Sequence, residues 1–182
     1  NNLNPRGVYN GKMEELKQTL MDDDCYIPFN RRKIPELTEN SEIFSPEGDP
    51  SCLRNGIDRP VGDNFNGWVG KKNSYIEYSF CEVKKVHKIR LVFDSNLNRK
   101  GQNMPCYYSL DQEPYKVPDV MVKSFRIEIK DANGNWVTCK RIENNYQRLV
   151  KLDVCAEAMA VRFIPEETWG SDEVHVFSFE VE

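Results

Sequence analysis

The chain has 182 residues and a formal net charge of −4, so it is long enough for one domain with a sizeable core and a short appendage. The acidic balance and the scattered basic residues exclude the clustered positive surface that a nucleic-acid partner requires. No apolar run approaches the length of a membrane-spanning helix, so we expect no membrane span.

Two predicted elements occupy the beginning of the chain. Residues 10–22 carry Met13, Leu16 and Leu20 at spacings of three and four, which predicts an amphipathic helix. Its apolar face packs either on its own domain or on a neighbouring upstream domain, and the pattern does not separate these alternatives. Residues 25–50 contain four prolines, which predict an extended linker laid over a surface.

After this linker the apolar residues alternate with polar ones. Phe125, Ile127 and Ile129 show the pattern most clearly, and period two with one apolar face is typical of antiparallel sheets covered on one side. The dipeptide Asn133-Gly134 predicts a tight hairpin. The segments expected as strands include 75–80, 88–93, 124–130, 146–152, 158–164 and 174–181.

About eight strands separated by turns predict an all-β fold, an antiparallel jelly-roll sandwich rather than βαβ units. We expect residues 1–50 to be a helix and linker from an upstream domain, and residues 51–182 to be the sandwich. The segment 95–120 interrupts the strands with three tyrosines and three prolines. Loops this long in compact domains are usually functional or disordered, and the aromatic content argues against disorder.

The sequence CLRNGIDRPVGDNFNGWVGKKNSYIEYSF, from Cys52 to Phe80, is similar to the opening of discoidin-like, galactose-binding-like jelly rolls. It has a glycine-rich loop carrying an acid, then a tryptophan, then a half-buried strand. The second half of the chain also resembles that pattern, with a strand, a hairpin, a crossing strand and a closing strand. Domains of this family mostly bind molecules rather than transform them, so the resemblance implies a binding function.

A narrower resemblance rests on the segments NGIDRPVGDNFNGW, IRLVFDSNLNR, VPDVMVKSFRIEI and RFIPEETWG. They look like the C-terminal region of a family of bacterial FAD-dependent oxidoreductases. There, a flavin domain is followed by a helix and linker similar to EELKQTLMDDDCYIPF and then by a β-sandwich. The chain has no GxGxxG turn, which an FAD domain of that kind needs for its pyrophosphate. The resemblance therefore implies FAD and a flavin domain upstream, and no cofactor of that kind in this chain.

Two functions follow from these resemblances. In the first, the chain is a non-catalytic accessory sandwich that packs on the flavin domain or helps to shape its site. In the second, it is an independent carbohydrate-binding module. The full gene would discriminate them, because the first requires a GxGxxG segment upstream and the second a neighbour such as a glycoside hydrolase. No catalytic residue is expected in either case, and His87 and His175 are interpreted as structural or surface residues.

For sugar binding, the chemistry requires an aromatic platform and polar partners on loops at one rim of the sandwich. Trp68 and Trp136 are expected in or at the edge of the core, whereas Trp169 lies on a predicted loop. The candidate ligand-binding residues are Arg99, Asn103, Tyr107, Tyr108, Glu167 and Trp169.

The discoidin-like resemblance also implies a structural Ca²⁺ beneath the opening loop, since that ion takes six to eight oxygen ligands. The candidate metal ligands are Asp58, Asp63 and Glu180. Two alternatives stay open. Arg59 pairs with Asp58 and removes the need for a metal, or the Asx-rich turn only caps its own backbone.

The six cysteines are dispersed and form no CxxC pair. We interpret them as mostly reduced structural residues, with a three-disulfide framework as the alternative. The chain begins Asn-Asn-Leu-Asn, so a targeting segment can lie upstream. The compartment stays open, and a periplasmic or extracellular location is favoured over the cytoplasm.

Overall fold

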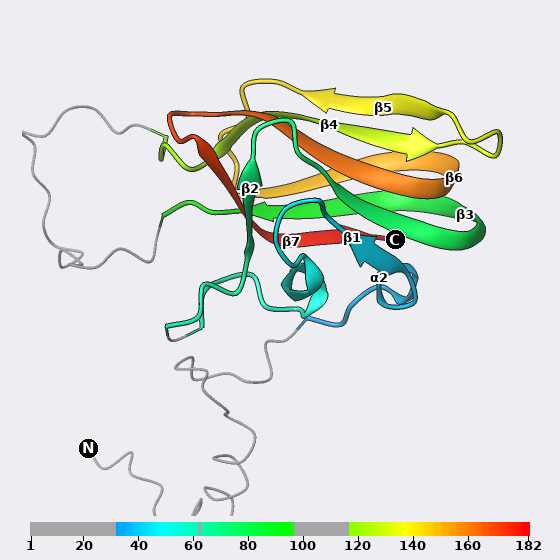
Figure 1. Ribbon diagram of the computed structural model, residues 1–182, viewed down its shortest axis with the longest axis horizontal. Coiled ribbons are helices and arrows are strands. Elements are labelled where there is room, and N and C mark those ends of the chain that lie inside the picture. The colour runs from blue at the N-terminus through cyan, green and yellow to red at the C-terminus, as the bar shows by residue number, and fades with distance from the viewer. Residues whose placement is uncertain (1–31, 62, 97–116) are drawn as a thin grey trace, which may run out of the picture.

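The computed structural model describes residues 32–61, 63–96 and 117–182, which form an antiparallel β-sandwich (Figure 1). This confirms the predicted all-β fold. The helix predicted over residues 10–22 lies outside the described residues. The elements in chain order are α2 (Glu36–Glu39), β1 (Glu42–Phe44), the 3-10 helix η2 (Ser51–Arg54), β2 (Trp68–Lys71), β3 (Ile76–Phe93), β4 (Val122–Lys130), β5 (Trp136–Ile142), β6 (Leu149–Thr168) and β7 (Glu173–Val181).

Two long strands belong to both layers of the sandwich. β3 and β6 have 18 and 20 residues, and the hydrogen-bonded order is β2-β7-β3-β6-β4-β5, with β1 added to β3. The second half of β3 pairs with β7 and with the first half of β6, whereas the second half of β6 pairs with β4. The continuous sheet therefore folds over itself, as the curved β3 and β6 in Figure 1 show.

The register of the β3–β6 pair shifts between Ser79 and Lys84 and again between Val86 and Lys88. Extra residues of this kind bend a strand and increase its twist. The segments 75–80 and 88–93, predicted as separate strands, are therefore largely one bent strand. The same holds for 146–152 and 158–164 in β6, which begins at Leu149.

Aromatic rings fill the space between the layers. Phe163 is fully buried, and its ring centroid lies 5.5 to 6.0 Å from those of Phe93, Phe125 and Phe179. Tyr78 packs on Phe179 at 5.0 Å and donates its hydroxyl hydrogen to the Phe179 carbonyl at 2.8 Å. Tilted ring pairs at these separations add to the stabilisation from burial.

Part of the predicted linker belongs to the sandwich, which corrects the expected boundary at residue 50. β1 pairs with β3, and the Thr38 hydroxyl donates to the Val181 carbonyl at 2.6 Å and accepts from the Val181 N–H at 2.7 Å. Prolines gave this segment the appearance of a linker because they favour extended backbone. The three residues of β1 are too few to show an alternating pattern.

The hairpin predicted at Asn133-Gly134 is present between β4 and β5. Gly134 has φ +86°, a backbone conformation that favours glycine, and its N–H donates to the Asp131 carbonyl at 3.0 Å. The register of the hairpin pairs Lys130 with Trp136.

Trp68 and Trp136 differ in burial. Trp68 is buried in the core as expected, and its indole N–H donates to the Ser45 hydroxyl at 3.0 Å. Trp136 instead lies on the outer face, where the Arg162 guanidinium is 3.8 Å from its ring centroid and 4.1 Å from that of Tyr75. This stack of a cation between two rings is a favourable surface arrangement.

Among the described residues, no helix is long and apolar enough to cross a membrane. Four cysteines of the described part carry free thiols: Cys52, Cys81, Cys139 and Cys155.

Candidate functional site

Three connections meet at one end of the sandwich (Figure 1). They are residues 117–121 before β4, 143–148 between β5 and β6, and 169–172 between β6 and β7. The Trp169 N–H donates to the Met121 carbonyl at 3.1 Å, and its indole N–H donates to the Asn145 carbonyl at 2.7 Å. These bonds tie the three connections together, and we call this region the loop-end site.

Asn145 fixes the geometry of the loop-end site. Its side chain is buried, and its amide N–H₂ donates to the Val122 carbonyl at 2.8 Å and to the Gln147 carbonyl at 3.0 Å. Its amide oxygen accepts from the Gln147 N–H at 3.1 Å. Asparagine favours such turns because its side chain mimics a backbone group. The next residue, Tyr146, therefore lies on a connection that is bonded to the Trp169 indole through the Asn145 carbonyl.

Two aromatic rings are exposed here. Tyr146 is 70% exposed and Trp169 is 37% exposed, although large aromatic side chains are usually buried. The Lys123 ammonium lies 5.7 Å from the Trp169 ring centroid and donates to the Glu167 carboxylate at 2.9 Å. Exposed rings with polar groups beside them offer both a stacking surface and hydrogen bonds to a ligand.

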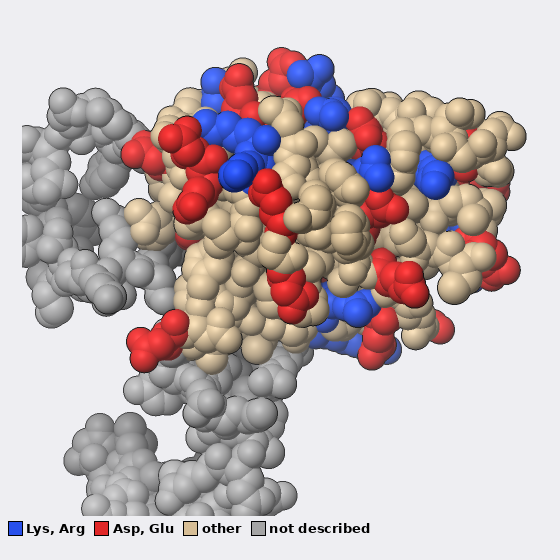
Figure 2. Space-filling model, viewed as in Figure 1, with Lys and Arg blue, Asp and Glu red and all other residues tan. Residues whose placement is uncertain are grey.

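A small polar pocket of about 280 Å³ is linked to Trp169 through Lys123, which lines the pocket and lies over the Trp169 ring. Its lining is Lys123, Ser124, Arg141, Glu143, Asn144, Glu166 and Glu167. The hydrogen bond from Lys123 lowers the pKa of Glu167, so Glu167 is a carboxylate at neutral pH. In Figure 2, acidic and basic side chains are interspersed over the part of the view where Figure 1 has β4, β5 and the turn after β6. Donors and acceptors side by side suit a ligand rich in hydroxyl groups.

The structure brings together two of the predicted ligand-binding residues, Glu167 and Trp169, through Lys123. The other four, Arg99, Asn103, Tyr107 and Tyr108, lie outside the described residues. Sequence reasoning missed Tyr146 because it was assigned to the start of a strand. The preceding Asn144-Asn145 pair is a turn signal that would have placed Tyr146 on a loop.

The predicted metal ligands Asp58 and Glu180 come together around arginines. Arg32 donates to Glu180 Oε1 at 2.6 Å and to Asp58 Oδ1 at 3.1 Å, and Arg90 donates to Asp58 Oδ1 at 3.2 Å and to the Ser178 hydroxyl at 3.1 Å. Glu180 is only 2% exposed. We call Arg32, Asp58, Arg90 and Glu180 the charge cluster.

In the charge cluster, burial alone would raise the pKa of Asp58. The hydrogen bonds and charge of Arg90, together with those of Arg32, outweigh burial and hold this pKa below its usual range. Asp58 is therefore a carboxylate at neutral pH, and the two guanidinium groups supply the positive charge that a metal ion would otherwise supply.

The third predicted metal ligand, Asp63, is exposed. Within the described ranges, no group of three or more His, Cys, Asp or Glu side chains is arranged to hold a metal ion. The Asx alternative fits the loop, because Asn55 Oδ1 accepts from the Ile57 N–H and Asn64 Oδ1 from the Asn66 N–H, both at 2.8 Å.

Calcium binding has a direct test. Because guanidinium groups already neutralise Asp58 and Glu180, we expect the midpoint of thermal unfolding to be the same in millimolar Ca²⁺ and in chelator. An ion at a hundred times its Kd would add about 2.7 kcal/mol to the free energy of unfolding, which raises the midpoint by several degrees. Such a rise would support the predicted calcium site.

His175 makes contacts within the fold, which agrees with its interpretation as a structural residue. Its Nδ1 is 3.0 Å from the Asp94 carboxylate, and its ring packs edge-on against Phe65 at 5.1 Å between centroids. The hydrogen bond to Asp94 raises the pKa of His175. This pair fastens the end of β3 to β7.

No family model matches the chain, and no curated protein matches it. Solved structures do match. A family 32 carbohydrate-binding module from Streptococcus pneumoniae EndoD has a TM-score of 0.57 at 13% identity, covering 80% of this chain and 97% of that one. A fucose-binding module from Streptococcus pneumoniae has a TM-score of 0.56 at 14% identity, with 82% and 98% covered.

A third similar structure is a family 32 module from Clostridium perfringens, in complex with GalNAc-β-1,3-galactose. Its TM-score is 0.55 at 9% identity, with 79% of this chain and 96% of that one covered. The chain therefore has the galactose-binding-like fold of family 32 carbohydrate-binding modules. These likenesses agree with the discoidin-like resemblance and give no support to a flavoenzyme parent.

Proposed function

We propose that this chain is a non-catalytic carbohydrate-binding module and that the loop-end site holds its ligand. The observation that carries the proposal is the exposed Trp169 ring, fixed by Asn145 and contacted by Lys123 of a pocket of mixed charge, with the exposed Tyr146 next to Asn145 in the chain. Sugars present apolar C–H faces to aromatic rings and hydroxyl groups to polar side chains, so this arrangement suits them. Similar structures are described as binding fucose, chitosan or GalNAc-β-1,3-galactose, which supports the same class of ligand.

The accessory role in a flavoenzyme stays a prediction. It rests on the segment resemblance, and the comparisons do not support it. The full gene decides, because a GxGxxG segment upstream would favour the flavin domain as partner. For the carbohydrate-binding module we propose a periplasmic or extracellular location, since polymeric glycans are found there.

The proposal predicts that Trp169→Ala weakens glycan binding about tenfold or more, because truncating a central tryptophan usually costs over 1.4 kcal/mol of binding free energy. Tyr146→Ala is expected to weaken it several-fold. A glycan array with fucose, galactose, GalNAc-β-1,3-galactose and chitosan oligosaccharides would identify a ligand, and calorimetry would then compare the variants.

The matched control is Phe44→Ala, which removes an exposed ring from β1, a strand that contributes no residue to the loop-end site. Its binding should equal that of the unmodified chain. Trp169→Phe separates stacking from the indole hydrogen bond to Asn145, and circular dichroism checks that each variant is folded. If neither Trp169→Ala nor Tyr146→Ala changes the affinity for the glycan, the loop-end site is not the binding site.

A further inference from the structure

A second cavity lies on the outer face of the sheet that carries the charge cluster. Its floor is made of alternate residues of three neighbouring strands, where Arg90 of β3 pairs with Lys151 of β6 on one side and with Glu180 of β7 on the other. Lys88 and Asp153 form the next cross-strand pair. Alternate residues of a strand share one face, so these side chains project together.

The residues that precede α2 form one wall of this cavity. Arg32 is held over the sheet by Glu180 and Asp58, and Lys33 and Pro35 follow it along the rim. The enclosed volume is about 500 Å³, within the roughly 300–1,000 Å³ range of small-molecule sites. We call this space the strap cavity.

The strap cavity is basic in an acidic chain. Five basic residues line it, namely Arg32, Lys33, Lys88, Arg90 and Lys151, against the three acids Asp153, Glu180 and Glu182. Asp58 also pairs with both arginines, so the positive excess comes from the three lysines. Glu180 is neutralised by Arg32, to which it is bound through both oxygens. The ammonium groups of Lys33, Lys88 and Lys151 have no ion-pair or hydrogen-bond partner within the part of the chain that the structure describes.

Unpaired lysines around a partly enclosed space attract an anion. Two unit charges 4 Å apart near a protein surface interact by about 4 kcal/mol, and lysine reaches its partner as a mobile point charge. The lysines come from three different elements, so an anion between them would be contacted from the rim, β3 and β6.

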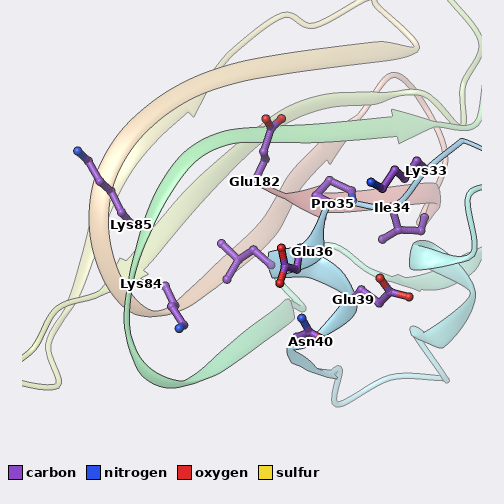
Figure 3. A pocket seen from close by; sticks show the side chains of 10 residues that line it. Lys33, Ile34, Pro35, Glu36, Glu39, Asn40, Lys84, Lys85 and Glu182 are labelled. Carbon is purple, nitrogen blue, oxygen red and sulfur yellow. The ribbon is translucent and has the colours of Figure 1, made fainter.

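An adjoining groove of about 980 Å³ shares Lys33, Pro35 and Glu182 with the strap cavity. Figure 3 shows Lys84 and Lys85 on the bend of β3, with Glu36 and Glu39 of α2 across the hollow. Three lysines and three glutamates line this groove, so its charges balance. The excess of positive charge therefore lies in the strap cavity and not in the adjoining groove, which leaves room for uncharged neighbouring units.

We propose that the strap cavity binds the carboxylate of an acidic sugar unit, such as a uronic acid, with Lys88 and Lys151 as its main contacts. It is a second site, and β6 contributes to both: Lys151 near its start faces the strap cavity, whereas Glu167 near its end belongs to the loop-end site. A monosaccharide fits its volume, and the neutral groove would take the rest of a longer chain.

The experiment is an NMR titration of the full chain with glucuronate, glucose and acetate at matched ionic strength. Glucuronate is expected to shift the amide signals of β3 and β6 around Lys88 and Lys151 and to bind at least several-fold more tightly than acetate or glucose. Lys88→Ala and Lys151→Ala should each weaken glucuronate several-fold, and raising NaCl to 0.5 M should weaken it further because of screening.

The control variant is Lys140→Ala, which removes one exposed charge from β5 and should leave glucuronate binding unchanged. Trp169→Ala should also leave it unchanged, so a failure of the loop-end site and a failure of this proposal are distinguishable. The proposal is refuted if glucuronate binds no more tightly than glucose or acetate. It is also refuted if neither lysine substitution changes the affinity for glucuronate.

Discussion

Replacing Arg32 with methionine is expected to lower the free energy of unfolding by about 2–4 kcal/mol. Arg32 binds both oxygens of Glu180, which is almost fully buried, so its loss leaves a buried carboxylate with few partners. Removing one partner of a buried ion pair typically costs about 3–5 kcal/mol, and the partial exposure of Arg32 reduces this. Urea unfolding followed by circular dichroism measures the change.

Two further variants decide whether charge is the cause. Adding Glu180→Gln to Arg32→Met removes the buried negative charge and should restore part of the lost stability. Arg141→Met removes an exposed guanidinium from Glu166, which keeps its ion pair with Arg126, and should cost less than about 1 kcal/mol. If Arg32→Met costs no more than Arg141→Met, the charge cluster contributes nothing to the fold.

The same cluster predicts a dependence on pH. The pKa of Asp58 is lowered in the folded state, so its contribution to stability is present above its unfolded pKa. That contribution is lost as the pH falls through the lower folded pKa. The free energy of unfolding should therefore decline in acid less steeply in the Arg32→Met variant than in the unmodified chain.

The sequence predicted the regular strands well because alternation is a local signal. Phe125, Ile127 and Ile129 alternate over a length that no turn interrupts, and Asn133-Gly134 adds the hairpin. The bend of β3 was missed because the register shifts around Lys84 and Val86 depend on the partner strand β6. Strand β1 was missed because its pairing with β3, and not its own pattern, makes it a strand.

The sites were predictable only in part. Trp169 and Glu167 were identified because a tryptophan between Thr168 and Gly170 indicates a loop. The charge cluster was missed because Arg32 and Glu180 are 148 residues apart, and no local pattern links them. The sequence raised the idea that Arg59 pairs with Asp58 and removes the need for a metal, and the structure shows two further arginines, Arg90 and Arg32, bound to Asp58.

Phe163→Ala is expected to have the largest effect on stability, about 3–5 kcal/mol of the free energy of unfolding. Phe163 lies on β6, fully buried, and contacts rings from β3, β4 and β7, so one truncation opens a cavity between both layers. Urea denaturation measures the change in the free energy of unfolding.

Phe163→Leu fills more of that space and should cost less than half as much, because the cost grows with the volume left empty. Phe44→Ala is the matched control, since Phe44 is 55% exposed on β1 and its loss opens no interior cavity. It should cost less than about 1 kcal/mol. Equal costs for Phe163→Ala and Phe44→Ala would mean that the ring cluster around Phe163 does not join the two layers. The stability of the loop-end site would then depend on its own hydrogen bonds through Asn145 rather than on the core beneath it.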